Sequence, residues 1–137
     1  MSRRTITIAA ALSVLALGSP LITGCSNSNG IIHFRSADLK YKRGDYQGAI
    51  DDLTQVIEIA YGNRGVAKAK SGDAQGAISD FNKAIEINPQ DAAHYYRRGT
   101  AKELVGDLKG ACADWEEAVS ILGHEDSAWA EMEMYQC

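Results

Sequence analysis

An internal repeat limits what this chain can fold into more than any other feature of its sequence. Residues 58–91 and 92–125 are identical at 12 of their 34 aligned positions. The two copies share an order of residue types: Tyr, Arg, Gly and Lys, then Ala, a large aromatic ring and Ala. These are Tyr61, Arg64, Gly65, Lys68, Ala77, Phe81 and Ala84 in one copy, and Tyr95, Arg98, Gly99, Lys102, Ala111, Trp115 and Ala118 in the other. A period of this length indicates supersecondary units that stack into one continuous core.

Each copy is expected to form two helices joined by a tight turn. Gly72 and Gly106 suit the left-handed position just after a helix, and Asp73 and Asp107, which follow them, suit the N-cap of the next helix. Pro89 ends the second helix of the first copy, because proline cannot continue a helix. The small residues of the pattern let paired helices approach closely, while the aromatic rings fill the space between repeats.

These positions resemble the tetratricopeptide repeat (TPR) family, whose pattern is W-x2-L-G-x2-Y…A-x3-F…P. The resemblance covers most of the chain after residue 30. It implies an all-α fold, a right-handed α-solenoid of three helix-turn-helix repeats with a C-terminal capping helix. The TPR domain is expected over residues 31–137, with repeats at about 30–60, 61–91 and 92–125 and the capping helix at 126–137. Helices are expected at 31–43, 46–60, 63–71, 74–87, 91–105, 108–121 and 126–136.

The first repeat is shorter than the other two. Ten of the sixteen residues from 44 to 59 recur 28 places later, so six residues of the period are missing where this repeat joins the next. We expect a short turn at the junction, with Gly62 capping one helix and Asn63 starting another. The alternative is a single helix that runs through the junction, with the first repeat docked differently.

The first 24 residues have the order of a secretory signal. Arg3 and Arg4 form a short basic start, and the apolar run from Ile6 to Leu17 is too short to span a bilayer comfortably. Residues 22–25, Ile-Thr-Gly-Cys, resemble a bacterial lipobox. That resemblance implies cleavage after residue 24 and lipid attached to Cys25, which would anchor the protein stably in a membrane. The alternative is an N-terminal membrane anchor that stays attached.

The signal implies a place in the cell. Residues 25–30 are rich in Ser, Asn and Gly and are expected to form a flexible tether. The protein is therefore expected in the bacterial cell envelope, lipid-anchored and facing the periplasm. Ser26 stands where an Asp would mark retention in the inner membrane, which favours the outer membrane.

With Cys25 assigned to lipid, Cys112 and Cys137 remain. Cys112 falls in the second helix of the last repeat, and Cys137 ends the expected capping helix. In an oxidising periplasm we expect them to form a disulfide that fastens this helix to the repeat, worth about 3 kcal/mol in the chain-entropy model. The alternative is a buried free thiol at Cys112.

The TPR resemblance also implies a binding surface, the concave face lined by the first helix of each repeat. Ten basic residues fall on these helices: Arg35, Lys40, Lys42, Arg43, Arg64, Lys68, Lys70, Arg97, Arg98 and Lys102. The second helices carry acidic residues instead, including Asp80 and Asp114, which predicts a module that is basic inside and acidic outside. The family's inward-facing positions select Phe34, Arg35, Asp38, Lys42, Asn63, Val66, Lys70, Tyr96, Arg97 and Thr100. We expect them to bind an acidic segment or a terminal carboxylate through charge-assisted hydrogen bonds.

Other classes of function have little support. The sequence contains no nucleophile elbow and no Gly-rich phosphate loop, so an enzyme, a cofactor and a small-molecule substrate are not expected. The His, Glu and Asp at 124–126 lack zinc-ligand spacing, so no metal site is expected. The net charge of −4 argues against a nucleic-acid partner.

The favoured function is a lipid-anchored scaffold or adaptor for protein–protein interaction. The alternative is a structural accessory subunit, or a pilotin-like lipoprotein, of an envelope assembly.

Overall fold

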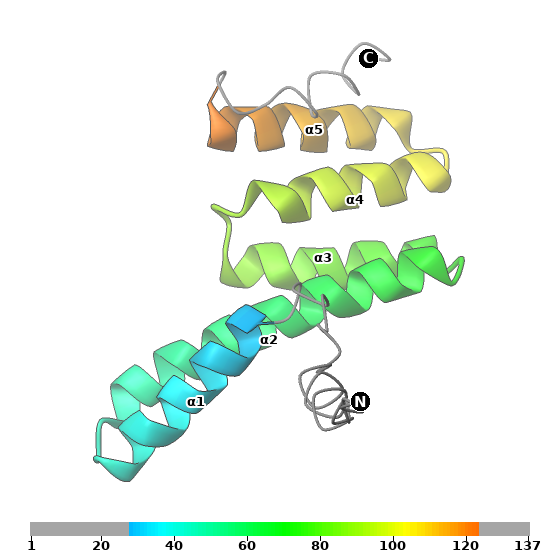
Figure 1. Ribbon diagram of the computed structural model, residues 1–137. Helices are drawn as coiled ribbons and strands as arrows, with labels where there is room; N and C mark the ends of the chain where they lie inside the picture. Colours follow the sequence, from blue (N-terminus) through cyan, green and yellow to red (C-terminus); the bar gives the residue numbers. More distant parts are fainter. Residues whose placement is uncertain (1–27, 124–137) are drawn as a thin grey trace, which may run out of the picture.

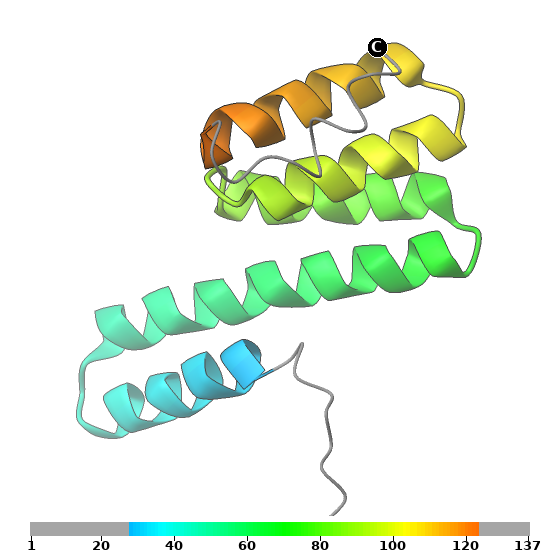
Figure 2. The same cartoon turned by 45° about the horizontal axis from the view of Figure 1, so that its top comes forward.

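The computed structural model describes residues 28–123, and every regular element among them is an α-helix. The helices are α1 (Ser28–Lys42), α2 (Tyr46–Lys70), α3 (Ala74–Ile87), α4 (Ala92–Leu104) and α5 (Leu108–Leu122). Helices α2 to α5 stack in chain order, and α1 lies beside the first half of α2 (Figures 1 and 2). This confirms the all-α solenoid. The predicted signal (1–24) and capping helix (126–137) lie outside the described residues, as do Cys25 and Cys137.

The predicted Gly-Asp turns form in all three repeats. Gly44, Gly72 and Gly106 have φ of 81°, 90° and 84°, the left-handed region that favours glycine after a helix. The aspartate that follows each glycine is the N-cap of the next helix, and its side chain accepts a hydrogen bond from the backbone N–H three residues later at 2.8–3.0 Å. None of the five described helices is long and apolar enough to cross a membrane.

Most helix boundaries agree with the sequence prediction. Helix α3 has the predicted ends, while α4 and α5 differ from prediction by one residue. Helix α1 begins at Ser28, so the last three residues of the predicted tether are helical. The larger difference concerns the junction of the first two repeats. The short turn predicted at Gly62 and Asn63 is wrong, because α2 runs unbroken for 25 residues through that point.

Helix α2 continues through the junction for local reasons. The junction carries no proline, and glycine costs only about 1 kcal/mol relative to alanine inside a helix. Gly62 is buried in the middle of α2 with the His94 ring packed against it, and a Cβ there would lie 2.6 Å from Cε1 of His94. The glycine read as a helix cap therefore provides space for a side chain of α4.

The core lies between the helices of the second and third repeats. Phe81 and Trp115 are each only 1% exposed, and each ring packs against the glycine of the first helix of its own repeat, Gly65 or Gly99. Small alanines surround them, as the repeat pattern predicted. The first hairpin buries much less: Ala37 and Ala49 are the apolar residues there with under 5% exposure.

Candidate functional site

Each regular repeat holds its two helices together with one buried aspartate. Arg64 donates two hydrogen bonds of 2.7 Å to the Asp80 carboxylate, and the Lys68 ammonium lies 3.1 Å from it. The Arg64 guanidinium also stacks over the Tyr61 ring, 5.3 Å from its centroid. The Arg64 hydrogen bonds are the main reason that the pKa of Asp80 lies below its usual value, against the opposing effect of burial.

The third repeat builds the same arrangement one period later in the chain. Arg98 donates hydrogen bonds of 2.8 and 2.6 Å to Asp114, and Lys102 lies 2.8 Å from that carboxylate. The Arg98 guanidinium stacks over Tyr95 at 5.4 Å. The hydrogen bonds from Arg98 to Asp114 raise the pKa of Arg98. The repeated Tyr, Arg, Lys and Asp therefore bind each other within a repeat.

The first repeat has a reduced version of this arrangement. Lys40 lies 2.8 Å from Asp52, while Ser36 stands where the other repeats have arginine. The pKa of Asp52 is lowered chiefly by its hydrogen bond with Lys40 and next by one with Ser36. The helices of the first hairpin are therefore held by a lysine–aspartate pair without the arginine that the other two repeats have.

These ion pairs correct the predicted charge distribution. Six of the ten basic residues assigned to the concave face form ion pairs with acidic side chains: Lys40, Lys42, Arg64, Lys68, Arg98 and Lys102. Asp80 and Asp114, predicted on the outer face, are buried between the helices. The prediction failed because side chains on two different helices meet only once the register of the hairpin is fixed. Within residues 28–123, no ion pair forms at Arg35, Arg43, Lys70 or Arg97, and all four are exposed.

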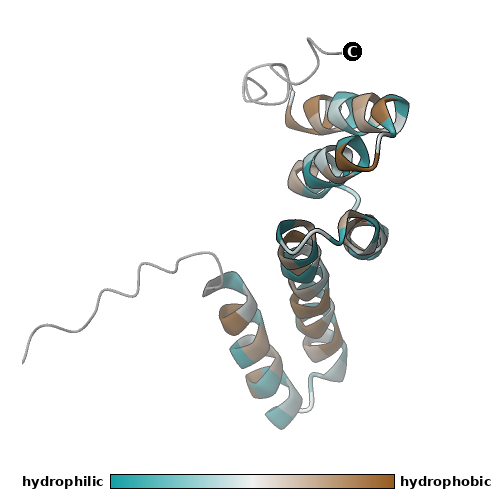
Figure 3. Ribbon diagram, turned by 90° about the vertical axis from the view of Figure 1, so that its right-hand side faces the viewer, coloured by the Kyte–Doolittle hydropathy of each residue, from teal (hydrophilic) through white to brown (hydrophobic). Residues whose placement is uncertain are grey.

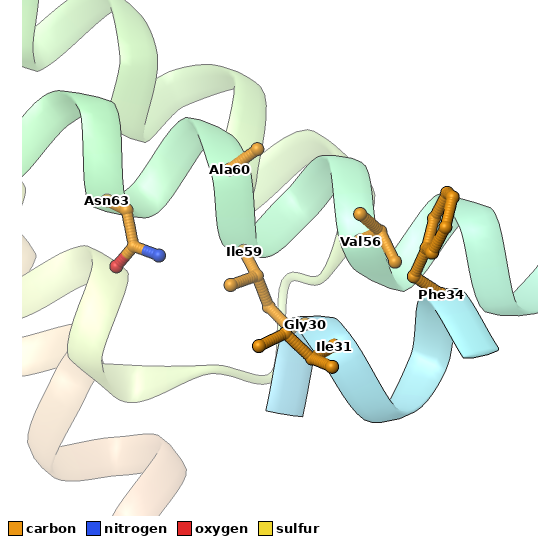
Figure 4. Close-up of a pocket in the computed structure, with 7 residues that line it drawn as sticks. All are labelled: Gly30, Ile31, Phe34, Val56, Ile59, Ala60 and Asn63. Atoms are coloured by element: carbon orange, nitrogen blue, oxygen red, sulfur yellow. The ribbon is translucent and has the colours of Figure 1, made fainter. Parts of the chain in front are cut away.

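Two adjoining hollows lie beside the junction, on the side of α2 that faces α1 and α4. One is a cleft of about 370 Å³ with mostly polar side chains, lined by Asn29, His33, Gln55, Glu58, Ile59, Gly62, Asn63, Val66, Asp91, His94 and Arg97. The other is an apolar cavity of about 380 Å³, lined by Gly30, Ile31, Phe34, Val56, Ile59, Ala60 and Asn63 (Figure 4). Ile59 and Asn63 line both, so the two hollows adjoin each other, and together they are called here the junction groove.

The predicted binding residues divide into two groups. Phe34, Asn63, Val66 and Arg97 line the junction groove, where Phe34 is 58% exposed. The others line neither hollow: Arg35, Asp38, Lys42, Lys70, Tyr96 and Thr100. Asp38 and Lys42 form an ion pair of 2.6 Å on the surface of α1, and the Thr100 hydroxyl donates to the Tyr96 carbonyl at 3.1 Å. The structure thus brings four of the ten together.

A buried polar cluster forms the wall of the groove next to Gly62. His94 and Glu58 are 3% and 4% exposed, and the His94 Nε2 atom pairs directly with the Glu58 carboxylate. Asp91, the N-cap of α4, lies 3.4 Å from the same nitrogen. Possible ligand atoms of the three residues lie within 4.8 Å of one another, an arrangement that can hold a divalent cation. Because the Nε2 atom of His94 already pairs with Glu58, the geometry is equally that of a structural pair.

Sequence reasoning missed this cluster. Glu58 and His94 are 36 residues apart, a separation close to one repeat, and neither is a pattern residue. The one available signal was that Asp91 and His94 have the spacing of neighbours on a helix face. Cys112, half-buried on α5, is disulfide-bonded, so the alternative of a free thiol is wrong. Its predicted pairing with Cys137 stays a prediction, since Cys137 lies outside the described residues.

Comparison with known proteins agrees with this geometry. A tetratricopeptide repeat profile matches residues 59–91, and a second one matches residues 33–61. The chain belongs to the tetratricopeptide repeat family. Membership supports a role in protein–protein interaction, as the sequence predicted. The border between the two matched repeats lies within the continuous helix α2, at Ile59 to Tyr61. No curated protein matches the chain.

Several solved TPR structures share the fold. The first TPR of Spaghetti (RPAP3), bound to the HSP90 peptide SRMEEVD, is 24% identical with a TM-score of 0.56, over 79% of this chain and 89% of that one. The Sgt2 TPR domain from Aspergillus fumigatus is 24% identical with a TM-score of 0.55, over 80% and 76%. The second TPR domain of human RPAP3, in complex with the HSP70 peptide SGPTIEEVD, is 24% identical with a TM-score of 0.55, over 81% and 96%.

Proposed function

We propose that the protein is a peptide-binding adaptor whose junction groove takes one extended segment of a partner protein. The observation that carries this proposal is that an apolar cavity and a polar cleft share the wall formed by Ile59 and Asn63. One short segment can then place an apolar side chain in the cavity and a charged or backbone group in the cleft. Such a combination is usual for peptide sites, where apolar pockets supply affinity and a few polar groups fix orientation.

The polar half of the groove suits a peptide backbone. Asn29, Gln55 and Asn63 are amides, and an amide side chain both donates and accepts hydrogen bonds. Arg97 is exposed and forms no ion pair within the described residues, so its guanidinium is available to a carboxylate. The preference for an acidic segment rests on this one arginine, since the other cations predicted for the face are paired or lie outside the groove.

Structural relatives support a partner of this kind. Two of the TPR domains that share the fold were solved with peptides whose last four residues are Glu-Glu-Val-Asp. Those peptides combine an apolar side chain with several carboxylates. This chain is similar to their receptors in fold, and its groove offers one apolar cavity and one arginine for such a segment.

A fluorescently labelled peptide SRMEEVD serves as the acidic probe, with anisotropy as the readout. We expect Arg97→Glu to weaken binding at least tenfold, because a hydrogen bond to a charged group contributes about 1.5–3 kcal/mol. Arg35→Glu is the matched control, since it reverses another exposed arginine, one that lines neither hollow. Equal losses from both variants would mean that only the overall charge matters, and no binding by the wild type would refute the acidic preference.

The adaptor is proposed to be held at a bacterial envelope membrane by lipid on Cys25. This rests on the lipobox resemblance of residues 22–25, which end shortly before α1 begins at Ser28. Intact mass and fractionation of the full-length protein expressed in a bacterium test it. The proposal requires loss of residues 1–24, added acyl mass on Cys25 and recovery in membranes. An uncleaved product without acyl groups would refute the anchor and leave the groove proposal standing.

A further inference from the structure

Helix α2 carries a continuous exposed stripe that the stacked repeats leave uncovered. Its members are spaced alternately four and three residues apart: Tyr46, Ile50, Leu53, Ile57, Ala60, Arg64 and Ala67. All seven are exposed; Tyr46 is 61% exposed, Ile50 55% and Ile57 49%. Hydrophobic residues recur along the whole length of this helix in Figure 3. Alternate spacing of four and three is the pattern of a seam where two helices pack knobs into holes.

We propose that this seam binds the same seam of a second copy of the chain, with the two α2 helices antiparallel across a two-fold axis. The missing six residues explain why the seam is open. A regular repeat would turn at the junction and fold its next helix back, whereas α2 continues straight and separates its two halves (Figures 1 and 2). In the dimer, the first half of α2 from one copy lies beside the second half of α2 from the other copy. It covers a face that neither chain covers by itself.

The sizes of the seam residues favour the antiparallel arrangement. The four bulky apolar residues, Tyr46, Ile50, Leu53 and Ile57, lie in the first half of α2, and Ala60 and Ala67 lie in the second. Antiparallel pairing about a centre between Ile57 and Ala60 puts Ile57 opposite Ala60 and Ile50 opposite Ala67. Large then meets small at both of these levels, which is how facing layers interdigitate. A parallel pairing would place bulky residues against each other.

Charge selects the same arrangement independently. The first half of α2, residues 46–58, contains three acidic residues and no basic one, while residues 59–70 contain three basic residues and no acidic one. Asp52, Glu58, Arg64 and Lys68 are already paired within their own chain. Antiparallel helices set the remaining Asp51 of one copy within about one helical turn of Lys70 of the other. Parallel helices would set like charges together. Among these, Asp51 and Lys70 are exposed and form no ion pair within residues 28–123, so they remain available to a second copy.

The seam also has a hole of the right kind at its middle. Ile57, Ala60, Tyr61 and Arg64 line a hollow of about 210 Å³. These residues have the spacing i, i+3, i+4 and i+7, the four that surround a knob from a facing helix. With the two-fold axis between Ile57 and Ala60, the side chain that meets this hollow is Ile57 of the second copy. One residue thus serves as knob on one chain and as part of the hole on the other.

Sedimentation equilibrium of the purified full chain in a density-matched detergent tests the dimer. The wild type is expected to be dimeric, and Ile57→Asp is expected to raise the dissociation constant at least a hundredfold, because it places two carboxylates at the middle of an apolar seam. The matched control, Ser79→Asp, adds the same charge at an exposed position of α3 and should leave the dimer intact. Circular dichroism verifies that both variants keep their helices. A monomeric wild type, or equal behaviour of the two variants, would overturn the proposal.

Photo-crosslinking tests the orientation. A benzophenone side chain at position 50 is expected to attach near Ala67 of a second copy, which mixed isotope-labelled chains identify by mass spectrometry. Attachment near position 50 of the second copy would mean a parallel pair, and attachment to another protein alone would mean a different occupant. Either result would refute the proposed interface.

Restoring the missing residues tests the cause. A variant in which a copy of residues 88–94 replaces Ala60 regains the full period of the other repeats and allows α2 to turn. We expect this variant to be monomeric with its helix content preserved, because each chain then covers its own seam. A dimer of undiminished strength would show that the continuous helix is not what opens the interface.

Discussion

Where the second and third repeats bury Phe81 and Trp115 to 1% exposure, the first hairpin has Leu53, which is 40% exposed. All three residues hold the same place after a Gly-Asp turn of the same geometry. The hairpins therefore form alike, and the difference arises afterwards, when hairpins stack. Phe81 and Trp115 each pack on the glycine of the first helix of their own repeat, and Phe81 also joins a core with Ala101 of the third repeat. The first hairpin instead shares a straight helix with its neighbour and cannot fold onto it. A connection six residues shorter thus changes what is buried without changing how each hairpin forms.

The largest expected effect comes from removing the large residue in each region. Phe81→Ala should lower the free energy of unfolding by about 3–5 kcal/mol, because it leaves a cavity beside Gly65 in the core. In the monomeric chain, Leu53→Ala should cost about 1 kcal/mol, since much of its side chain contacts water there, and it should cost more in the proposed dimer. Urea unfolding of both variants measures the contrast. Equal costs would mean that Leu53 is covered in solution, as full occupancy of the dimer seam would require.

The second effect concerns the buried pair at the boundary of the two regions. Glu58→Ala should cost about 2–3 kcal/mol, because it leaves the His94 ring buried without its partner. Glu86→Ala, on the exposed surface of α3, should change stability by less than about 0.5 kcal/mol. Thermal unfolding with and without a chelator distinguishes a direct Glu58–His94 pair from a metal site. A melting temperature lowered by the chelator, or raised by added Zn²⁺, would contradict the direct pair.

The smallest effect is a pH dependence of stability that distinguishes the buried Arg64–Asp80 pair from an exposed ion pair. Arg64 holds the pKa of Asp80 below its unfolded value of about 3.9. The stability from this carboxylate is therefore fully present above about pH 4 and is lost as the pH falls through the lower folded-state pKa. Asp80→Asn should flatten the acid limb of the stability curve, while Asp38→Asn, at an exposed ion pair, should leave it nearly unchanged. Parallel acid limbs for the wild type and Asp80→Asn would contradict the assignment.

Local features of this fold could be predicted from the sequence because they depend on neighbours in the chain. Each Gly-Asp turn sets its own geometry, and α3 ends where Pro89 follows. The junction depended on more than that. Gly62 can cap a helix or lie inside one, and the His94 ring that packs on it comes from α4, beyond the whole of α3. A turn at Gly62 and a continuous helix differ in energy by only a helix cap and one buried contact. The repeat pattern of the sequence cannot decide between two structures so close in energy.

The candidate site was predictable in the same partial way. Asn63 and Arg97, selected from the family positions, both line the groove, because those positions describe which face of a helix points inward. Their binding of a partner stays a prediction. The basic character of that face was wrong, since Arg64, Lys68, Arg98 and Lys102 bind the buried Asp80 and Asp114. Counting charges along helices cannot distinguish a solvated cation from one that closes a hairpin. That distinction needs the distance between side chains on the two helices of a repeat.

The straight helix α2 also has a consequence for folding cooperativity. In repeat proteins, the stability of an array is a sum of unit stabilities and of the interfaces between neighbouring units. Here the first interface is nearly absent: α1 packs on the first half of α2, α3 packs on the other half of the same helix, and α4 packs mainly on α3. Opening α1 therefore exposes little of the remaining core. The amides of α1 should exchange with solvent through local opening, well before the global unfolding that releases those of α3 and α5.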